Sequence, residues 1–255
     1  MRHRALWGAV LFAARLAHAD SAALSRDLAD TDEARAIEAA ATLGKSSDAR
    51  AVESLVAALD AGTTPKVAAA LCAALGAKKD PRGVVILTQY AHHRAPEVRK
   101  AALAALALVN DKRATAALIA ALGDSDAEVR AAAAKGIADR RERTAEDRLI
   151  KLMEHRDASA ATALAAIATP QLAHRLSEML GQVPDPILCT ALGEMLKRGD
   201  FGPEPIRVEV VRTLSKVPGV DSTAVLVEYL ASTERDKNRP SRLEAQKIVD
   251  ERSRQ

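Results

Sequence analysis

Apolar residues in the middle of the chain recur with a period of 31 residues. The matching positions are Val67, Val98 and Val129, then Leu75, Leu106 and Ile137, and then Leu87, Leu118 and Leu149. A fixed period of this size predicts a solenoid, in which each unit buries its apolar face only against its neighbours. Proteins of this kind act mainly through an extended surface rather than a deep pocket.

Two helices fit into one period. Apolar residues from Val98 to Val109 recur at helical spacing, and those from Thr115 to Leu122 repeat that spacing after a turn at Asn110 and Asp111. No alternating apolar run indicates a strand in this region. The pattern therefore predicts an all-α fold, an α-α superhelix (solenoid) of about seven helical hairpin repeats.

The repeated motifs resemble a known family. They are Glu-Val-Arg at 97–99 and 128–130, Asp-x-Arg turns at 48–50, 80–82 and 111–113, and the second-helix segment 117–122. Over residues 32–154 these units resemble short bacterial HEAT repeats, similar to the repeats of phycobilin lyases. A period of 31 is also close to tetratricopeptide and ankyrin repeats. Beyond residue 19, however, the chain has no Trp and no Thr-Pro-Leu-His segment.

The first residues have the layout of a secretory signal peptide. Arg2 and Arg4 precede the apolar run 5–14, and Ala-His-Ala at 17–19 provides a small-residue cleavage site. The run is too short to span a bilayer, so we expect a signal peptide at 1–19 and no transmembrane segment after its removal. The expected location is periplasmic or secreted. An ordinary amphipathic helix is the alternative for this segment.

The rest of the chain divides into segments that keep the 31-residue period and segments that do not. Residues 20–31 form a lead-in or N-terminal cap, and residues 32–180 form the regular HEAT-like repeats. The pattern fails at 181–205, where we expect one helix followed by a loop in place of its partner helix. Matching leucines return at an offset of 108, so residues 206–255 are interpreted as a further repeat and a C-terminal capping helix.

Charge weighs against nucleic-acid binding. Removing residues 1–19 takes away three arginines, Arg2, Arg4 and Arg15, so the net charge falls from +3 to zero. A neutral chain lacks an overall basic footprint, although a local patch remains compatible with it. Only Tyr90, Phe201 and Tyr229 remain as aromatic residues, so platforms for stacking bases are scarce.

No enzymatic motif is evident. Cys72 and Cys189 fall about four repeats apart, too far for an internal disulfide at ~9 Å per helix layer; two buried thiols or an intermolecular bridge remain open. His93 and His155 are two periods apart, at turns about 20 Å from each other, which is too far for one metal ion. The chain has no phosphate loop or nucleophile elbow. We therefore expect no catalytic, cofactor-binding or metal-binding residues and no cofactor.

The candidate binding residues lie on second helices, which line the concave face in the resembling family. They are Gln89, Asp147, Arg148 and Lys151. Phe201, in the irregular loop, is a further candidate; the alternative is that it fills the gap left by a missing helix. The Asp-x-Arg turns provide a candidate ladder that locks adjacent repeats, with a cationic edge for an acidic partner as the alternative. The ladder residues are Asp48, Arg50, Asp80, Arg82, Asp111 and Arg113.

These observations favour a non-enzymatic HEAT-repeat scaffold that binds a protein or peptide through its concave face. One alternative is a lyase, or a lyase-like accessory protein, that handles a chromophore or cofactor, as the resemblance allows. A second alternative is a nucleic-acid-binding HEAT-like protein.

Overall fold

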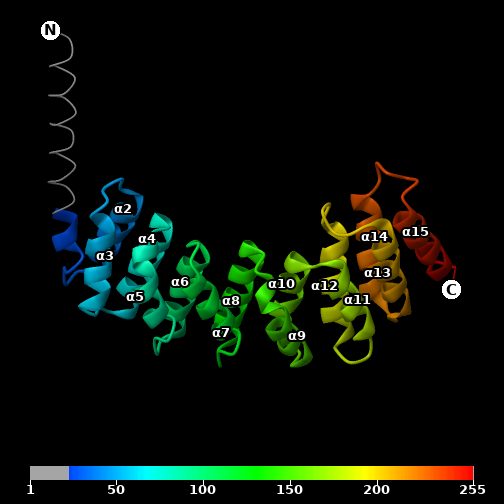
Figure 1. Ribbon diagram of the computed structural model, residues 1–255, viewed down its shortest axis with the longest axis horizontal. Coiled ribbons are helices and arrows are strands. Elements are labelled where there is room, and N and C mark those ends of the chain that lie inside the picture. The colour runs from blue at the N-terminus through cyan, green and yellow to red at the C-terminus, as the bar shows by residue number, and fades with distance from the viewer. Residues whose placement is uncertain (1–22, 255) are drawn as a thin grey trace, which may run out of the picture. The chain divides into compact units, whose positions relative to one another are not determined.

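The computed structural model describes residues 23–254, and this part of the chain contains helices and no strand (Figure 1). The predicted signal peptide and the first residues of the lead-in lie outside it. Residues 23–27 are helical, and Leu28 after them is buried. The chain forms two compact units, one ending at Gly136 and the other beginning at Ile137.

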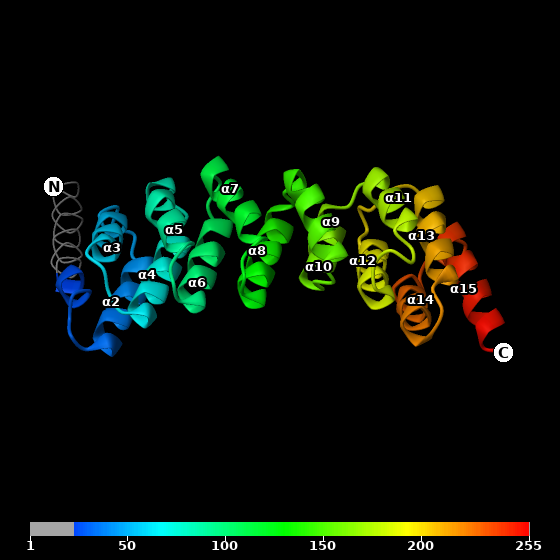
Figure 2. The same ribbon diagram turned by 90° about the horizontal axis from the view of Figure 1, so that it is seen from below.

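The first unit consists of two layers of helices. The first layer contains α2 (Glu33–Lys45), α4 (Pro65–Lys78) and α6 (Pro96–Ala107), which pack in succession. The second layer contains α3 (Ala51–Asp60), α5 (Val84–Tyr90) and α7 (Lys112–Ala121), and it lies on the other side in Figure 2. A 3₁₀ turn, η1 (Pro81–Gly83), leads into α5, and α8 (Ala127–Arg140) crosses the unit boundary.

The element starts reproduce the 31-residue period. First helices begin at Pro65, Pro96 and Ala127, and second helical segments begin at Pro81, Lys112 and Arg143, each 31 residues after the last. Proline suits the first helical position because it has no amide hydrogen to leave unpaired. The period therefore fixes where each helix begins as well as which face is buried.

Aspartates begin the second helical segments. The side chains of Asp80 and Asp111 accept hydrogen bonds from the backbone N–H groups of Arg82 and Arg113. Such a cap satisfies an N–H that has no partner inside the helix. The Asp-x-Arg motif is thus in the first place a helix-start signal.

The second unit continues the alternation of helices. A 3₁₀ turn, η2 (Arg143–Ala145), leads into α9 (Glu146–Glu154). One layer contains α10 (Ser159–Ile167), α12 (Asp185–Lys197) and α14 (Val220–Ser232). The other contains α11 (Pro170–Glu178), α13 (Glu204–Lys216) and α15 (Pro240–Arg252) (Figure 2). The described residues thus form seven helix pairs, from α2 and α3 to α14 and α15.

The predicted loss of a helix near residues 198–205 is wrong. Helix α13 is the second member of the pair begun by α12, and the predicted division between residues 205 and 206 falls inside it. The offset of 108 matched Leu106 of a first helix with Leu214 of a second helix, and both leucines are buried. First and second helices share the same apolar spacing, so the pattern alone did not distinguish them. For the same reason, α15 completes the seventh pair rather than forming an additional cap.

Candidate functional site

A groove lies on the second-helix face of the first unit, between α3 and α5. In each unit, the surface formed by the exposed residues of the second helices is called the second-helix face. The groove has a volume of about 400 Å³, and its walls include Val56, Ile86 and the predicted candidate Gln89. Gln89 is exposed, and the side chain of Val85 beside it is 54% exposed. The groove therefore offers apolar contact area with a polar amide at its edge.

Arg82 lines this groove and forms ion pairs with two neighbouring carboxylates. Its guanidinium donates to Glu53 of α3 at 2.9 Å and to Asp80 of its own turn at 2.8 Å. It also donates to the carbonyl oxygen of Ala49 in the preceding repeat at 3.2 Å. The hydrogen bonds from Arg82 lower the pKa of Asp80. These charges are therefore paired with one another rather than free to act on a substrate.

The three predicted ladder pairs form within their own turns. The distances between guanidinium nitrogen and carboxylate oxygen are 3.8 Å for Arg50 and Asp48, 2.8 Å for Arg82 and Asp80, and 2.8 Å for Arg113 and Asp111. Hydrogen bonds from Arg113 lower the pKa of Asp111 to about 2. Arg82 also reaches the preceding repeat, as the ladder interpretation expects.

A second link between repeats, which the sequence analysis missed, is formed by Arg99. Its guanidinium makes a bidentate pair with Asp124 in the next turn, at 2.7 and 2.8 Å, and donates to the carbonyl of His93 at 2.9 Å. Burial is the largest single influence on Asp124 and raises its pKa, but the hydrogen bonds from Arg99 and from the backbone N–H of Asp126, together with the charges of Arg99 and Arg130, lower it overall. The signal for this link was the arginine of the Glu-Val-Arg motif.

Ion pairs also join successive second helices of the second unit. Arg175 of α11 contacts Asp147 of α9 at 2.8 Å, and Arg212 of α13 contacts Glu244 of α15 at 2.8 Å. Between these pairs, His174 of α11 lies 2.7 Å from Glu209 of α13. This contact raises the pKa of His174. The candidate Asp147 is thus exposed and already paired.

Arg148 and Lys151, the other candidates on α9, are exposed. Within residues 23–254 neither side chain has an ion-pair or hydrogen-bond partner. They are therefore available to an external partner.

Phe201 is not a surface residue. Its side chain is 1% exposed, and the guanidinium of Arg207 lies 5.5 Å from the centre of its ring. Arg207 is itself buried and donates to the carbonyl of Leu196 at 3.0 Å. Phe201 therefore packs the connection between α12 and α13; the gap of a missing helix that the alternative expected it to fill does not exist, because α13 follows α12, and its burial rules it out as an exposed binding residue.

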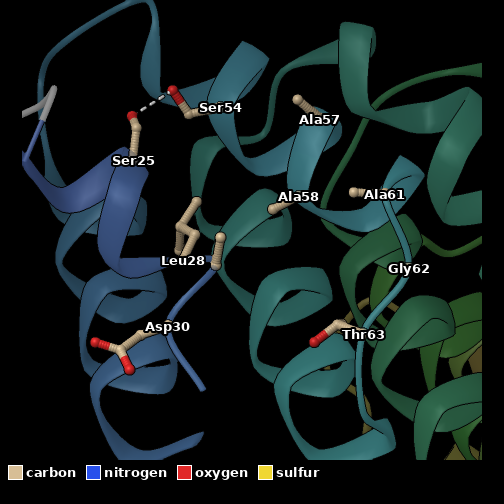
Figure 3. Close-up of a pocket in the computed structure, with 10 residues that line it drawn as sticks. Ser25, Leu28, Asp30, Ser54, Ala57, Ala58, Ala61, Gly62 and Thr63 are labelled. Carbon is tan, nitrogen blue, oxygen red and sulfur yellow. Dashed lines mark hydrogen bonds between the residues drawn. The ribbon is translucent and has the colours of Figure 1, made fainter. Parts of the chain in front are cut away.

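Further hollows lie elsewhere in the described units, and one of about 420 Å³ is lined by Thr162 and Glu194. Two others lie near residues 25–30 and around His174. The first, of about 480 Å³, lies between residues 25–30 and α3, where the Ser25 hydroxyl donates to that of Ser54 at 2.7 Å (Figure 3). Most of its other lining residues are small. The second, of about 350 Å³, lies between α11 and α13 around His174. In the second hollow, the buried hydroxyl of Ser177 has no hydrogen-bond partner among residues 23–254.

Metal and thiol chemistry have no evident site in residues 23–254. No group of three or more His, Cys, Asp or Glu side chains in this range could hold a metal ion. Burial raises the pKa of Cys72 to about 12 and that of Cys189 to about 11. Both thiols are unbridged, so they are unreactive core residues in this conformation. No helix in the same range is long and apolar enough to cross a membrane.

The predicted turn histidines have separate environments. His93 stacks on Tyr90, with ring centres 5.9 Å apart, and its Nδ1 atom accepts from the backbone N–H of Ala95. His155 follows α9 in the other unit and is exposed. His93 therefore has contacts within its own turn, and the side chain of His155 is exposed.

The family profile described as HEAT repeats matches residues 52–128 and 115–197, more than half of the chain. The protein belongs to the HEAT-repeat family. No curated protein gives a significant sequence match.

Comparison with known structures gives matches at low sequence identity. The chain is similar to a homology model of the full-length AP-3 complex, with TM-score 0.56 and 13% identity, covering 92% of this chain and 51% of that one. A complex of CpcE and CpcF of phycocyanin lyase from Nostoc sp. PCC7120 gives TM-score 0.49 and 20% identity, covering 89% and 92% of the two chains. A designed armadillo repeat protein gives TM-score 0.34 and 19% identity, covering 89% and 97%. At these identities the similarity concerns the HEAT-repeat architecture alone.

Proposed function

We propose that this HEAT-repeat protein is a non-enzymatic scaffold that binds a protein or peptide through its second-helix face. The observation that carries the proposal is the groove between α3 and α5, where Val85 is 54% exposed next to Gln89. An exposed apolar side chain in a groove gains free energy when a partner covers it. Two charged residues of the groove, Glu53 and Arg82, are paired with each other. The predicted signal peptide supports a periplasmic or secreted location for this binding.

The proposal is tested by partner capture with two single variants. Val85→Glu places a charge in the groove, whereas Leu108→Glu changes a residue of similar exposure, 51%, that does not line it. We expect the wild-type protein and Leu108→Glu to retain one discrete protein partner from the periplasmic or culture fraction, and Val85→Glu to lose it. Equal recovery by all three would contradict the groove as the binding site.

Protein from the same preparation also distinguishes the scaffold from the alternative of a lyase-like protein that handles a chromophore. A coloured small molecule bound to the purified protein, detected as a visible absorption band in the absence of a protein partner, would favour a lyase-like role. A partner protein and no such band would favour the scaffold.

A further inference from the structure

We propose that α9 carries a basic strip that binds an acidic segment of the partner protein. The strip consists of Arg148 and Lys151, which lie on one face of α9 at i and i+3, and His155, the residue that caps the C-terminal end of the helix. All three residues are exposed. The inference rests on the proposed function, because it names the chemistry of the protein partner that the scaffold would bind.

The acidic side of α9 is already neutralised. Glu146 and Asp147 both accept hydrogen bonds from Arg175 of α11, at 3.2 and 2.8 Å. This arrangement separates the charges of the helix, because the carboxylates are directed to α11. Arg148 and Lys151 remain as exposed cationic groups of α9 that form no ion pair within residues 23–254.

Some basic groups on other second helices of the second unit are paired across helices, whereas others, such as the exposed Lys247 of α15, form no ion pair within residues 23–254. Arg212 and His174 each have a carboxylate on the next second helix, Glu244 and Glu209. The side chains of the strip have no such partner among residues 23–254. Glu154, three residues after Lys151, is exposed but forms no ion pair with it. Carboxylates supplied by a partner would therefore form ion pairs without displacing existing ones.

The spacing of the strip fits an acidic polypeptide. Side chains three and four residues apart on a helix have Cβ atoms about 5–6 Å apart. Carboxylates one turn apart on a partner helix have a similar spacing, and alternate residues of an extended segment are about 6.6 Å apart. Two or three acidic side chains can therefore meet the strip in register.

Other anionic partners fit the strip less well. Nucleic-acid binding depends on many phosphate contacts and, for single strands, on aromatic side chains that stack with bases. Phe201 and Tyr229, the aromatic residues of this unit, are both buried. Membrane surfaces are bound by helices that also expose apolar residues, whereas those of α9 are buried, namely Leu149, Ile150, Leu152 and Met153.

The test uses fluorescence anisotropy with a fluorescein-labelled oligoglutamate peptide and the full-length protein. Arg148→Glu/Lys151→Glu reverses the strip, and Arg148→Gln/Lys151→Gln neutralises it. The control Arg235→Glu/Lys247→Glu makes the same change in charge at two exposed residues of the same unit. We expect binding about tenfold weaker in the reversed variant, a smaller loss in the neutral variant, and little change in the control.

The proposed role of the strip would be contradicted if the wild-type protein did not bind the peptide, or if the reversed variant and the control lost equal affinity for it. Tighter binding of labelled duplex DNA than of the peptide at physiological salt would also contradict it. The protein partner captured with wild type provides the second readout. If the reversed variant retains that partner with unchanged affinity, the strip is wrong and the scaffold proposal stands. If neither wild type nor Leu108→Glu captures a partner, the scaffold proposal itself fails.

Discussion

Glycine and alanine set the distance between neighbouring first helices. A Cβ atom added to Gly76 of α4 would lie 2.7 Å from the Cα atom of Ala105 in α6, and one added to Gly44 would lie 3.0 Å from the Cα atom of Ala74. Real Cβ atoms essentially never make contacts shorter than 3.0 Å, and a contact of 3.0 Å is already unusually tight. Close approach of the helix backbones therefore depends on the missing side chains at these two positions.

We expect Gly76→Ala to destabilise the protein. In an open helix this change would stabilise by up to about 1 kcal/mol, but here the added methyl group meets backbone, and overpacking costs about 1–3 kcal/mol. Urea unfolding of the variant and of the wild-type protein measures the change in the free energy of unfolding. Gly199→Ala is the control, since nothing lies within 4 Å of its added Cβ atom. A gain in stability from Gly76→Ala would contradict the close packing of α4 and α6.

Burial was predictable from sequence for helical residues and not for loop residues. The apolar spacing correctly identified Val98, Leu106 and Leu118 as core residues. Phe201 follows no helical period, and its burial depends on Arg207 lying against its ring. Side chains brought together by a loop leave no periodic signal.

At the scale of the helices, arginine side chains hold the repeats together. Arg99 and Asp124 are 12% and 14% exposed, and the pair is bidentate. Arg130 donates to the carbonyl oxygens of Asp124 and Ser125 in the turn before α8, as Arg99 does to those of His93 and Arg94 before α6. The Asp-x-Arg turns were the more visible sequence motif, but much of their pairing is local.

Arg99→Met should therefore destabilise the protein by about 1–2 kcal/mol, because it leaves the carboxylate of Asp124 partly buried without its partner. Arg113→Met is the matched control. Arg113 is 58% exposed and pairs within its own turn, so we expect little effect. Chemical denaturation of the two variants measures the difference. Equal losses would show that the link between repeats is no stronger than a surface pair.

A histidine joins two second helices of the second unit, so its contribution to stability depends on pH. The pKa of His174 is raised above its usual 6.5 by Glu209. The protonated form is therefore favoured in the folded state. This contribution is fully present below pH 6.5 and is lost as the pH rises through the folded-state pKa.

We expect the difference in stability between wild type and His174→Gln to be present below pH 6.5 and to disappear as the pH rises through the raised pKa of His174. Urea unfolding at a series of pH values measures this difference. A difference that is constant with pH, or that increases above neutrality, would contradict the ion pair.

At the scale of the molecule, the 31-residue period predicted the fold and the regular helix pairs. It did not predict the later pairs as well, because the spacing between equivalent helices changes there: α10, α12 and α14 begin at residues 159, 185 and 220. The binding surface was predictable only as far as which helices carry it. Which of its charges are paired depends on contacts between helices, such as that of Arg175 with Asp147.

The central claim is that a protein partner binds the second-helix face, and site-specific photocrosslinking in the native host tests it most directly. A photoreactive residue would replace Gln89 or Lys151 on second helices, and Ala104 or Thr162 at exposed positions of first helices as controls. We predict discrete protein adducts from Gln89 and Lys151 and none from the two controls. Adducts from the first-helix positions, or none from the second-helix positions, would contradict the claim.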